Sequence, residues 1–481
     1  MKEKGVNEKL VTVADVARWD REVDVLVAGL GCAGAAAAIE AARAGADVLV
    51  VERASGGGGT SAMSGGVIYL GGGTDLQRAC GFEDSAEQMY AYLAASCGDA
   101  PDLDKLRPYC EHSVEHYDWF VELGLPFKPV FYPHYSGEPP GDEGLVYSGS
   151  ENCHPYNEIA RPAPRGHVAA TANQTGWLLM QKLTEAVEAS LATTLYDTRC
   201  TALVVDAAGA VVGALLGNTD GELAVRVRGG VVLTTGGFIC NSSMLEQYAP
   251  TAGRCLFKVG AEGDDGSGIG LGMAAGGHAI NMEMGSISLP LTPPKSLQRG
   301  ILVNEHGQRF INEDAYMGAL GYSVLYGQQG RAWLILDEAC WEKPEVERPV
   351  AGVGESAEEL EQTLGLPTGS LVATLAEYNR GAEQGSDPGF HKGESYLVPL
   401  RPPYGALDCT VDNSMFAVFT LGGLATDADG RVLMVDGGVV EGLYAAGRAS
   451  ACLAAPGYSS GLSIGDGTFF GRRAGRHATG L

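Results

Sequence analysis

The spacing of the hydrophobic residues alternates along the chain between patterns typical of strands and patterns typical of helices. The clearest example comes first. An apolar run with β-branched residues at Val23–Val27 predicts a strand, and a glycine turn follows it. An alanine-rich segment then predicts a helix, and a second apolar run at Val48–Val51 predicts another strand. Strand, helix and strand in this order predict a βαβ unit with parallel strands.

Helical spacing returns in three later segments. It predicts helices over Ser85–Cys97, with Ser85 as N-cap, over Leu103–Leu123 and over Gln174–Ala189. Between the last two lies Pro126–Ala170, which is rich in Pro, Gly, Tyr and His and has no periodicity. A long irregular stretch inside an enzyme is usually functional, so we expect this one to wrap a site.

A β-rich block follows, and its turn signals at Ala208-Gly209 and Asp220-Gly221 predict a small antiparallel meander. Its four expected strands are Thr201–Val205, Val211–Leu216, Leu223–Arg228 and Val231–Thr234. The last strand leads into a glycine turn, and Glu262–Gly266 begins a glycine-rich helix that ends near Gly276-Gly277.

The pattern of expected strands and helices changes again from residue 281 to about 403. This change predicts a separate domain that caps the substrate. Its expected elements are strands at Ile301–Asn304 and Ala332–Leu336 and helices at Ala357–Leu364 and Ser370–Glu383. The C-terminal part returns to glycine-rich α/β character. There we expect a strand at Gly442–Ala445, a turn at Gly447-Arg448 and a helix that begins near Ser463.

Composition and charge narrow the function. The chain of 481 residues has 70 glycines, about twice the usual share, yet its 45% hydrophobic and 19% charged residues are those of a globular protein. We therefore interpret the glycines as loops around a ligand. A net charge of −26 argues against nucleic acid or an anionic membrane surface as a partner.

Cysteine usage and hydropathy bear on location. The 11 cysteines are scattered, with no CxxC pair and no metal-ligand spacing, so we expect reduced thiols, no metal and a cytoplasmic protein. No apolar run reaches the ~18 residues of a transmembrane helix, and no signal-like leader precedes the first strand. His112 and His116 are four residues apart, but without a third ligand a solvated helix face is the favoured interpretation.

The first βαβ unit carries a dinucleotide fingerprint. Gly29 allows the tight turn, Gly31 lets the backbone approach a pyrophosphate and Gly34 lets the helix pack against the strand. The helix N-terminus offers N–H groups to the phosphates, and Glu52, eighteen residues after the last glycine, can bind a ribose. The Gly/Ser/Thr-rich loop after Glu52 offers further N–H groups to a phosphate or a ring.

Together with Thr235-Gly236-Gly237, Asp265-Gly266 and Gly442–Gly447, this fingerprint resembles the fumarate reductase/succinate dehydrogenase-type FAD flavoproteins. The βαβ unit alone would serve NAD or FAD, and the late glycine turn and second helix favour flavin. The resemblance implies a Rossmann-like, glutathione-reductase-type FAD-binding domain that is discontinuous (1–280 and 404–481), with an inserted α+β capping domain (281–403). It implies FAD contacts at Gly29, Gly31, Cys32, Ala33, Gly34, Glu52, Arg53, Gly59, Thr60, Ser61, Ser64, Gly65, Gly66, Cys200, Gly236, Asp265, Gly447, Arg448, Gly461, Ser463 and Ile464.

Two departures from that family matter. Members with covalent flavin carry a His near the second glycine loop, whereas this chain has Thr60 and Ser61, so the FAD should be non-covalent. Dicarboxylate reductases use a His-x-Thr before a Gly-Gly to bind a carboxylate, and here Phe419 occupies the place of the cation. A carboxylate would then be desolvated without a partner, which is costly.

Several long strings resemble the 3-ketosteroid dehydrogenases, above all the Δ4-(5α) type. They are Ser64–Thr74, Leu145–Gly149, Ala163–His167, Asn312–Tyr316 and Pro456–Gly461. The resemblance implies three catalytic residues. Tyr458 would donate its O–H to the C3 carbonyl, Ser460 would take the C4 proton, and Tyr316 would assist Ser460 and pass the proton to solvent, with hydride transfer from C5 to FAD N5.

This interpretation predicts an enzyme that interconverts 3-keto-5α-steroids and 4-ene-3-ketosteroids. The alternatives are a related FAD reductase of another α,β-unsaturated ketone or enoate, such as a bile-acid intermediate, and a flavin electron carrier without catalysis. The sequence leaves open the physiological direction, the electron acceptor or donor, the exact steroid and the oligomeric state.

Overall fold

Strand β2 (Arg21–Ala28) lies inside a nine-stranded sheet, between β3 (Val48–Val51) and β11 (Gly221–Leu233), and is parallel to both. The computed structural model describes residues 9–134, 139–455 and 457–480. The strand order is β1-β9-β10-β11-β2-β3-β8, and β22 and β21 extend it beside β11. The predicted α/β class is confirmed. The bounds of the other strands in this sheet are β1 (Lys9–Thr12), β8 (Thr193–Leu195), β9 (Arg199–Val205), β10 (Val211–Asn218), β21 (Arg431–Leu433) and β22 (Val439–Ala445).

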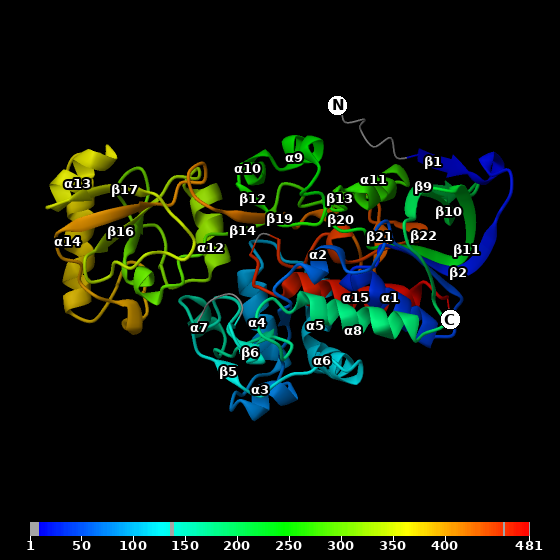
Figure 1. Ribbon diagram of the computed structural model, residues 1–481, viewed down its shortest axis with the longest axis horizontal. Coiled ribbons are helices and arrows are strands. Elements are labelled where there is room, and N and C mark those ends of the chain that lie inside the picture. The colour runs from blue at the N-terminus through cyan, green and yellow to red at the C-terminus, as the bar shows by residue number, and fades with distance from the viewer. Residues whose placement is uncertain (1–8, 135–138, 456, 481) are drawn as a thin grey trace.

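Three helices lie along one face of this sheet: α1 (Cys32–Arg43), α8 (Gly176–Glu188) and α15 (Leu462–His477) (Figure 1). Helix α15 approaches α1 closely because Gly471 and Gly475 stand four residues apart on the facing side. A Cβ at these glycines would lie 2.5 Å from the Ala33 carbonyl oxygen and 2.2 Å from that of Ala37. Helix α11 (Ser267–Ala274) packs on the other face, where its Leu271 joins a core cluster with Leu26 of β2 and Leu49 of β3.

The meander has three strands where four were expected. Strands β9 and β10 match the prediction in place and in antiparallel pairing. The two expected strands Leu223–Arg228 and Val231–Thr234 are one continuous strand, β11, whose pairing to β2 shifts register between Val227 and Gly230. The glycine pair that suggested a break is therefore a local irregularity within one strand.

The helix expected over Leu103–Leu123 is two helices, α5 (Leu103–Glu111) and α6 (Ser113–Glu122), which meet at His112. His116 was expected on a solvated face, but it is fully buried, whereas His112 is exposed. Helix α4 (Ala86–Ser96) begins as predicted, because the Ser85 side chain accepts a hydrogen bond from Gln88 N. The described residues hold no cluster of three or more His, Cys, Asp or Glu that could bind a metal.

The stretch expected to be irregular, Pro126–Ala170, contains residues 135–138, which lie outside the described residues. Its described part forms most of a small four-stranded sheet in the order β4-β7-β6-β5. Strand β4 precedes the stretch in the chain and lies within the Ser64–Thr74 string. The bounds are β4 (Ile68–Tyr69), β5 (Phe131–Tyr132), β6 (Leu145–Val146) and β7 (Gly166–His167).

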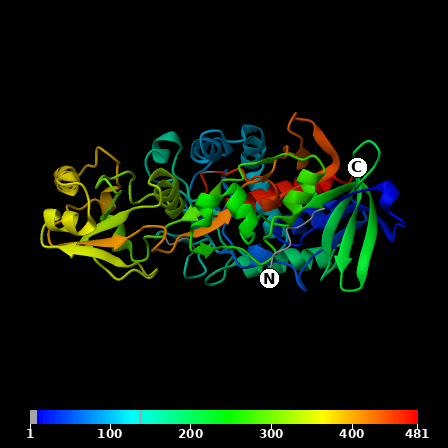
Figure 2. The same ribbon diagram turned by 90° about the horizontal axis from the view of Figure 1, so that it is seen from above.

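A separate four-stranded sheet forms the cap, with the order β15-β16-β18-β17. Figure 2 shows the cap at one end of an elongated molecule and the meander at the other. Strand β18 (Tyr404–Asp408) pairs with both β16 and β17, so it belongs to the cap sheet although the expected boundary after Pro403 excludes it. The pairing favours a cap that extends through Asp408. The other cap elements are β15 (Ile301–Val303), β16 (Trp333–Asp337), β17 (Val350–Gly354), α13 (Ala357–Leu364) and α14 (Ser370–Glu383).

Two small sheets lie between the cap and the large sheet, with the orders β12-β19-β14 and β13-β20. Their bounds are β12 (Phe257–Lys258), β13 (Ala279–Ile280), β14 (Gly285–Ser288), β19 (Ala417–Thr420) and β20 (Gly423–Leu424). The remaining α-helices are α2 (Gly59–Ala62), α3 (Asp75–Ala79), α7 (Tyr156–Ile159), α9 (Ser242–Tyr248), α10 (Pro250–Gly253) and α12 (Met317–Tyr322). No helix within the described ranges is both long enough and apolar enough to cross a membrane.

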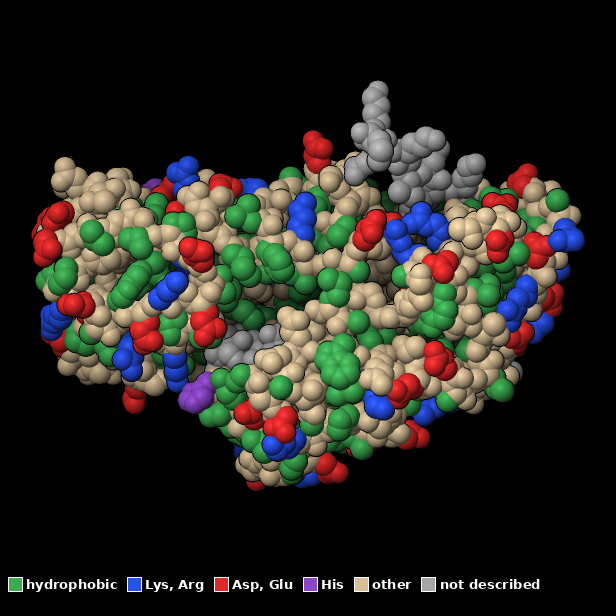
Figure 3. Space-filling view, in the orientation of Figure 1, with side chains coloured by type: hydrophobic (Ala, Val, Ile, Leu, Met, Phe, Trp, Pro, Cys, Tyr) green, Lys and Arg blue, Asp and Glu red, His purple; other side chains and the backbone are tan. Residues whose placement is uncertain are grey.

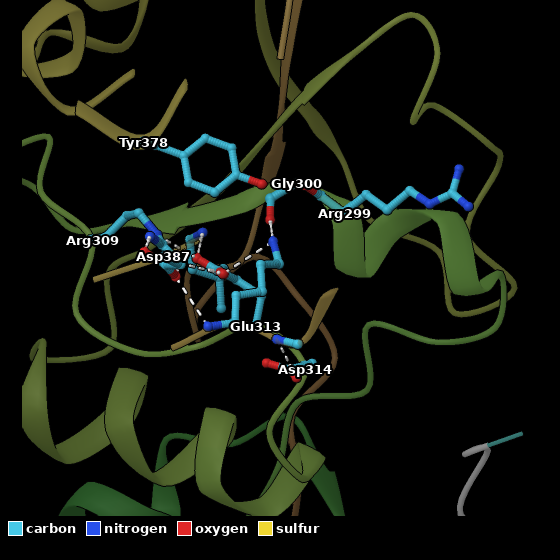
Figure 4. Close-up of polar contacts among 10 residues, drawn as sticks. Arg299, Gly300, Arg309, Glu313, Asp314, Tyr378 and Asp387 are labelled. Atoms are coloured by element: carbon cyan, nitrogen blue, oxygen red, sulfur yellow. Dashed lines mark hydrogen bonds and ion pairs between the residues drawn. The ribbon is translucent and has the colours of Figure 1, made fainter. Parts of the chain in front are cut away.

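A buried ionic network fixes the end of the cap nearest α12. Arg309 binds Glu313 and Asp387, each at 2.9 Å, and Lys392 lies 3.1 Å from Glu313. Figure 4 shows Arg309, Glu313 and Asp387 converging. Burial raises the pKa of Glu313, but Lys392 and Arg309 outweigh it, so the pKa lies below its ordinary value and the carboxylate is charged. Arg309 and Glu313 stand four residues apart in the chain, so this ion pair is local in sequence.

Candidate active site

The first glycine turn has the geometry that a dinucleotide requires. A Cβ on Gly34 would lie 1.9 Å from the Gly29 carbonyl oxygen, so Gly34 is needed for the helix to pack against the strand, and Gly29 has a positive φ of 104°. Gly31 is different, because a Cβ there would meet nothing closer than Ser61 Oγ at 3.5 Å. The N-terminus of α1 therefore has space beside Gly31, which fits a pyrophosphate at this end of the helix.

Glu52 follows β3 and lies beside this turn. Its two carboxylate oxygens accept hydrogen bonds from Leu30 N and Ala54 N, both at 2.8 Å. Each oxygen keeps a second lone pair that a ribose hydroxyl could use. The next residue, Arg53, pairs with Asp265 at 2.7 Å, and Arg199 reaches the same carboxylate at 3.8 Å.

The structure thus brings Cys200, which follows Arg199 on β9, to the neighbourhood of Arg53 and Asp265. Asp265 also lies two residues before the start of α11, where its Oδ1 accepts a hydrogen bond from Ser267 N at 3.0 Å. The residues expected at the nucleotide end therefore come together, although they lie far apart in the sequence.

The Gly/Ser/Thr-rich loop is held over the N-terminus of α1. Ser61 Oγ accepts a hydrogen bond from Cys32 N at 3.2 Å, and Thr60 Oγ1 accepts one from Ala261 N at 2.9 Å. Ser64 Oγ donates to the Ser61 carbonyl at 2.7 Å and accepts from Gly66 N at 3.2 Å. Gly59 has a positive φ of 48°, and the Gly65 carbonyl accepts a hydrogen bond from Thr175 N at 3.0 Å.

The second glycine turn, at Gly236 and Gly237, carries polar atoms without partners. Arg448 pairs with Asp264 beside it, and an added Cβ on Gly237 would lie 3.0 Å from Arg448 Nη1. Among the described residues, three buried atoms here have no hydrogen-bond partner: Thr235 Oγ1, Asp264 Oδ1 and Arg448 Nη1. Buried polar atoms are normally satisfied, so this set fits a polar ring or chain of a bound cofactor.

The C-terminal glycine turn lies against the first. Gly447 has a positive φ of 63°, and a Cβ there would lie 2.9 Å from Ala33 Cβ. Gly461, with a φ of 94°, is the N-cap of α15, whose first turn contains Ser463 and Ile464. The N-termini of α1 and α15 and the turn at Gly447 therefore lie close together, and each carries residues that were expected around a flavin.

Tyr316 and Ser460 come from opposite sides of the molecule and meet. Tyr316 precedes α12 next to the cap, Ser460 precedes α15, and their hydroxyl oxygens are 2.8 Å apart. Tyr316 is buried, with 4% of its surface exposed. The pair is a hydrogen-bonded route for a proton between the two sides.

Tyr458 lies two residues before Ser460. Its hydroxyl oxygen is 2.9 Å from Ser463 Oγ and accepts a hydrogen bond from Ser463 N at 3.3 Å. Burial raises the pKa of Tyr458 to about 12, so the phenol stays protonated and can donate. Pro456, at the start of the same string, lies outside the described residues.

An aromatic wall stands beside Tyr458. The Phe419 ring packs edge-on against the Tyr458 ring, with centroids 5.2 Å apart, and Arg448 lies behind Phe419 at 5.6 Å from the centroid. Arg448 is already paired with Asp264. This cation beside the wall therefore has a carboxylate partner.

A cavity of about 160 Å³ lies beside Tyr316, between the cap and the small four-stranded sheet. The space-filling view shows the surface hollowed between the cap and the rest of the molecule, with hydrophobic side chains around the hollow (Figure 3). The cavity is lined by polar and aromatic side chains, among them Tyr132, Tyr147, Asn152, Asp314, Tyr316 and Tyr396.

The sequence did not predict the residues that hold the Tyr316–Ser460 pair in position. Ser460 N donates to the Ser148 carbonyl at 2.8 Å, and Tyr316 N donates to Ser150 Oγ at 3.1 Å. Tyr92, on α4, contacts the same loop. The string Leu145–Gly149 marked this segment as part of a resemblance, but no spacing linked it to residues 316 or 460.

A family model described as an FAD binding domain matches residues 24–462 of the chain. Among curated proteins, the chain is similar to the 3-oxo-5-alpha-steroid 4-dehydrogenase of Comamonas testosteroni, with 30% identity over 90% of this chain and 94% of that protein. It is also similar to the 3-oxosteroid 1-dehydrogenase of Mycolicibacterium smegmatis, with 28% identity over 94% of this chain and 96% of that protein.

The chain is also similar to two solved structures. One is the 3-ketosteroid-Δ4-(5α)-dehydrogenase of Rhodococcus jostii in complex with 4-androstene-3,17-dione, with 45% identity, a TM-score of 0.93 and coverage of 98% of this chain and 99% of that chain. The other is a flavocytochrome c3 fumarate reductase in an open conformation, with 25% identity, a TM-score of 0.66 and coverage of 96% and 79%.

Proposed function

The chain belongs to the FAD-binding flavoprotein family that includes fumarate reductase, and we propose that within it the protein is a 3-oxo-5α-steroid 4-dehydrogenase. It interconverts 3-keto-5α-steroids and 4-ene-3-ketosteroids and uses FAD. One observation carries this proposal. The chain is similar over 98% of its length, at 45% identity, to a Δ4-(5α)-dehydrogenase with a 4-ene-3-ketone bound, and it holds a hydroxyl pair where that chemistry needs a proton route.

Different residues of the chain bind the carbonyl oxygen and remove the proton. In this proposal Tyr458 donates to the C3 carbonyl oxygen, because its raised pKa keeps the phenol protonated while charge develops on that oxygen. Ser460 takes the C4 proton. A serine hydroxyl is a weak base, so it passes its own proton to Tyr316 across the 2.8 Å hydrogen bond, and Tyr316 releases its phenolic proton to solvent in the same relay.

FAD, when bound, supplies the acceptor for the hydride that leaves C5. Residues of the two glycine turns, the loop at 59–66 and the first turn of α15 would hold it, as their open space and unpartnered polar atoms indicate. Thr60 and Ser61 engage Ala261 and Cys32 through hydrogen bonds, and we propose that FAD is bound without a covalent link.

The aromatic wall favours a ketone over a dicarboxylate. A dicarboxylate needs unpaired cations, whereas Phe419 faces Tyr458 and Arg448 is paired with Asp264. We propose a bulky, apolar steroid-like substrate for this reason. All 11 cysteines are free, which supports a cytoplasmic location.

The product identifies the reaction. Purified enzyme is incubated with 5α-androstane-3,17-dione and an artificial electron acceptor, and the product is analysed by mass spectrometry and NMR. We expect 4-androstene-3,17-dione, and no product from the Ser460→Ala variant at a matched FAD content. A 1-ene product would assign a different dehydrogenation, and the absence of any product with 3-ketosteroids would refute the proposal.

A further inference from the structure

A short loop, Ser148–Glu151, contacts both members of the catalytic pair. On one side the Ser148 carbonyl accepts a hydrogen bond from Ser460 N at 2.8 Å. On the other side Ser150 Oγ accepts one from Tyr316 N at 3.1 Å. Ser148 and Ser150 are 0% and 4% exposed, so solvent does not compete for these bonds. The loop is therefore a bridge between the two sides that supply the reacting hydroxyl groups.

Tyr92 of α4 supports this bridge from behind. Its hydroxyl oxygen accepts a hydrogen bond from Ser150 N at 2.9 Å and lies 3.0 Å from Ser459 Oγ. Ser459 is the neighbour of Ser460 in the chain. The contact is tight, because a Cβ on Gly149 would lie 2.3 Å from both the Tyr92 and the Ser459 hydroxyl oxygens. One phenol thus connects the loop directly to the turn that carries Ser460.

These contacts form a closed ring of hydrogen bonds, which is completed by the peptide bond between Ser459 and Ser460. It runs from Tyr316 to Ser150, from Ser150 to Tyr92, from Tyr92 to Ser459, and from Ser460 back to Tyr316. Every link is a hydrogen bond of 3.1 Å or less between buried or partly buried groups. A closed ring of this kind fixes the separation of Tyr316 and Ser460, whereas the pair's own bond would be a single flexible contact.

We propose that Tyr92 and Ser150 are positioning residues that set the Tyr316–Ser460 geometry and so control removal of the C4 proton. This inference rests on the proposed function and adds two residues to its machinery. Neither residue is placed here in contact with substrate or FAD. Their loss should slow the proton step and leave cofactor and steroid binding almost unchanged, because misplacing a reacting group by 1 Å can cost about 10²-fold.

The test uses Tyr92→Phe, which removes one hydroxyl and keeps the ring that packs against Tyr156 at 5.5 Å. The control is Tyr90→Phe in the same helix, where the ring lies against Arg107 at 3.7 Å and away from the bridge. A second variant, Ser150→Ala, removes the other link, and Ser150→Thr restores the hydroxyl.

Proton removal can be followed separately from hydride transfer. With the flavin kept reduced, hydride cannot leave C5, so exchange of the C4 protons of 5α-androstane-3,17-dione with D2O, followed by NMR, reports the proton step alone. We expect Tyr92→Phe and Ser150→Ala to slow this exchange about 10- to 100-fold. FAD content, Tm and KM should match wild type, and Tyr90→Phe and Ser150→Thr should exchange within about threefold of wild type.

Wild-type exchange in Tyr92→Phe and Ser150→Ala would overturn the inference. So would a loss that comes with lost FAD or with an equal rise in KM, since either would indicate general damage. Failure of the proposed function looks different, because wild-type enzyme itself would then show no exchange and no turnover. A crystal structure of Tyr92→Phe gives an independent readout: the Tyr316–Ser460 hydroxyl distance should exceed hydrogen-bond range.

Discussion

At the scale of single residues, burial decides which chemistry a side chain can perform. Tyr458 and Tyr316 are ordinary phenols in sequence, and their roles follow from position. Tyr458 is partly buried against Phe419 and keeps its proton, whereas Tyr316 has a hydroxyl partner on the opposite side of the site. A donor to a developing oxyanion is effective when it is held in place, as Tyr458 is by Phe419 and Ser463.

Replacing Tyr458 with Phe should remove that donor and leave the ring packing intact. We expect turnover to fall by ~10²–10³-fold, the usual effect of losing one oxyanion donor, with FAD still bound. The measurement is kcat together with the flavin absorbance of the purified variant. Tyr444→Phe is the control, because it loses one phenol hydrogen bond, to His477 at 2.9 Å, outside the proposed site. Wild-type kcat in Tyr458→Phe would remove Tyr458 from the mechanism.

At the scale of elements, the sequence predicted what local patterns encode. The βαβ unit, the first two strands of the meander and the helices α4, α13 and α14 were expected within a few residues of their observed bounds. The sequence did not reveal pairings over long separations. Strand β18 joins the cap sheet because β16 and β17 flank it, and two-residue strands such as β6 have no periodicity to read.

The residues of the candidate site likewise fall into those that the sequence could predict and those that it could not. The glycines of the first turn could be predicted, because a close approach of backbone to backbone requires glycine. Tyr316 and Ser460 followed from a family resemblance and not from spacing. Tyr92 and Ser150 could not be predicted, since a buried tyrosine on an amphipathic helix is usually core, and only the fold brings its hydroxyl to Ser459.

The small four-stranded sheet, whose strands β6 and β7 flank the loop Ser148–Glu151 in the chain, contains a pH-sensitive group. His167 on β7 is fully buried and is hydrogen-bonded to Thr74 Oγ1 at 2.8 Å and to the Arg165 carbonyl at 3.1 Å. Burial lowers its pKa from 6.5 to about 4, although the bond to Arg165 opposes this shift. Below pH 6.5 the unfolded chain therefore binds a proton that the folded chain does not, so stability is lost as the pH falls.

We expect the free energy of unfolding to decrease by roughly 3 kcal/mol from this group between pH 6.5 and about 4. His167→Gln, which retains a donor and an acceptor, should show a shallower decrease. The measurement is urea denaturation of both proteins at several pH values in this range. Because other groups titrate equally in both proteins, the difference between the two curves isolates His167. Parallel curves would contradict the assignment.

The ionic network of the cap is a second element whose removal should be costly. Glu313 is fully buried and faces both Arg309 and Lys392. Glu313→Gln would leave two buried cations without their shared anion and should destabilise the protein by about 3–5 kcal/mol. The measurement is the unfolding midpoint in urea. Glu383→Gln, which breaks an exposed pair with Arg401, should change stability by less than about 1 kcal/mol. Equal effects would show that burial of the network is unimportant.

At the scale of the whole molecule, the site exists only where distant parts of the chain meet. Residues of α1, the loop at 59–66, the turn at 236–237 and α15 surround the cofactor region, and the cap region adds Tyr316. FAD should therefore stabilise the entire fold, because it binds the native arrangement and not the unfolded chain.

Stripping FAD should lower Tm, and adding it back should raise the free energy of unfolding by about 2.7 kcal/mol when free FAD is 100 times its Kd. NAD at the same concentration should give a much smaller effect. Denaturing the holoprotein in acid should release all of the flavin, as expected for a non-covalent cofactor. An equal response to NAD would contradict the preference for flavin, and a yellow precipitate would show a covalent link.

The central claim is that FAD faces a site in which phenol and alcohol groups, and not cationic residues, act on a steroid ketone. Anaerobic mixing of the oxidised protein with 5α-androstane-3,17-dione tests it most directly, with the flavin absorbance followed over time. We predict that the yellow colour bleaches, and that fumarate does not restore it. An unchanged spectrum with 3-ketosteroids, together with reoxidation of the reduced protein by fumarate, would contradict this account.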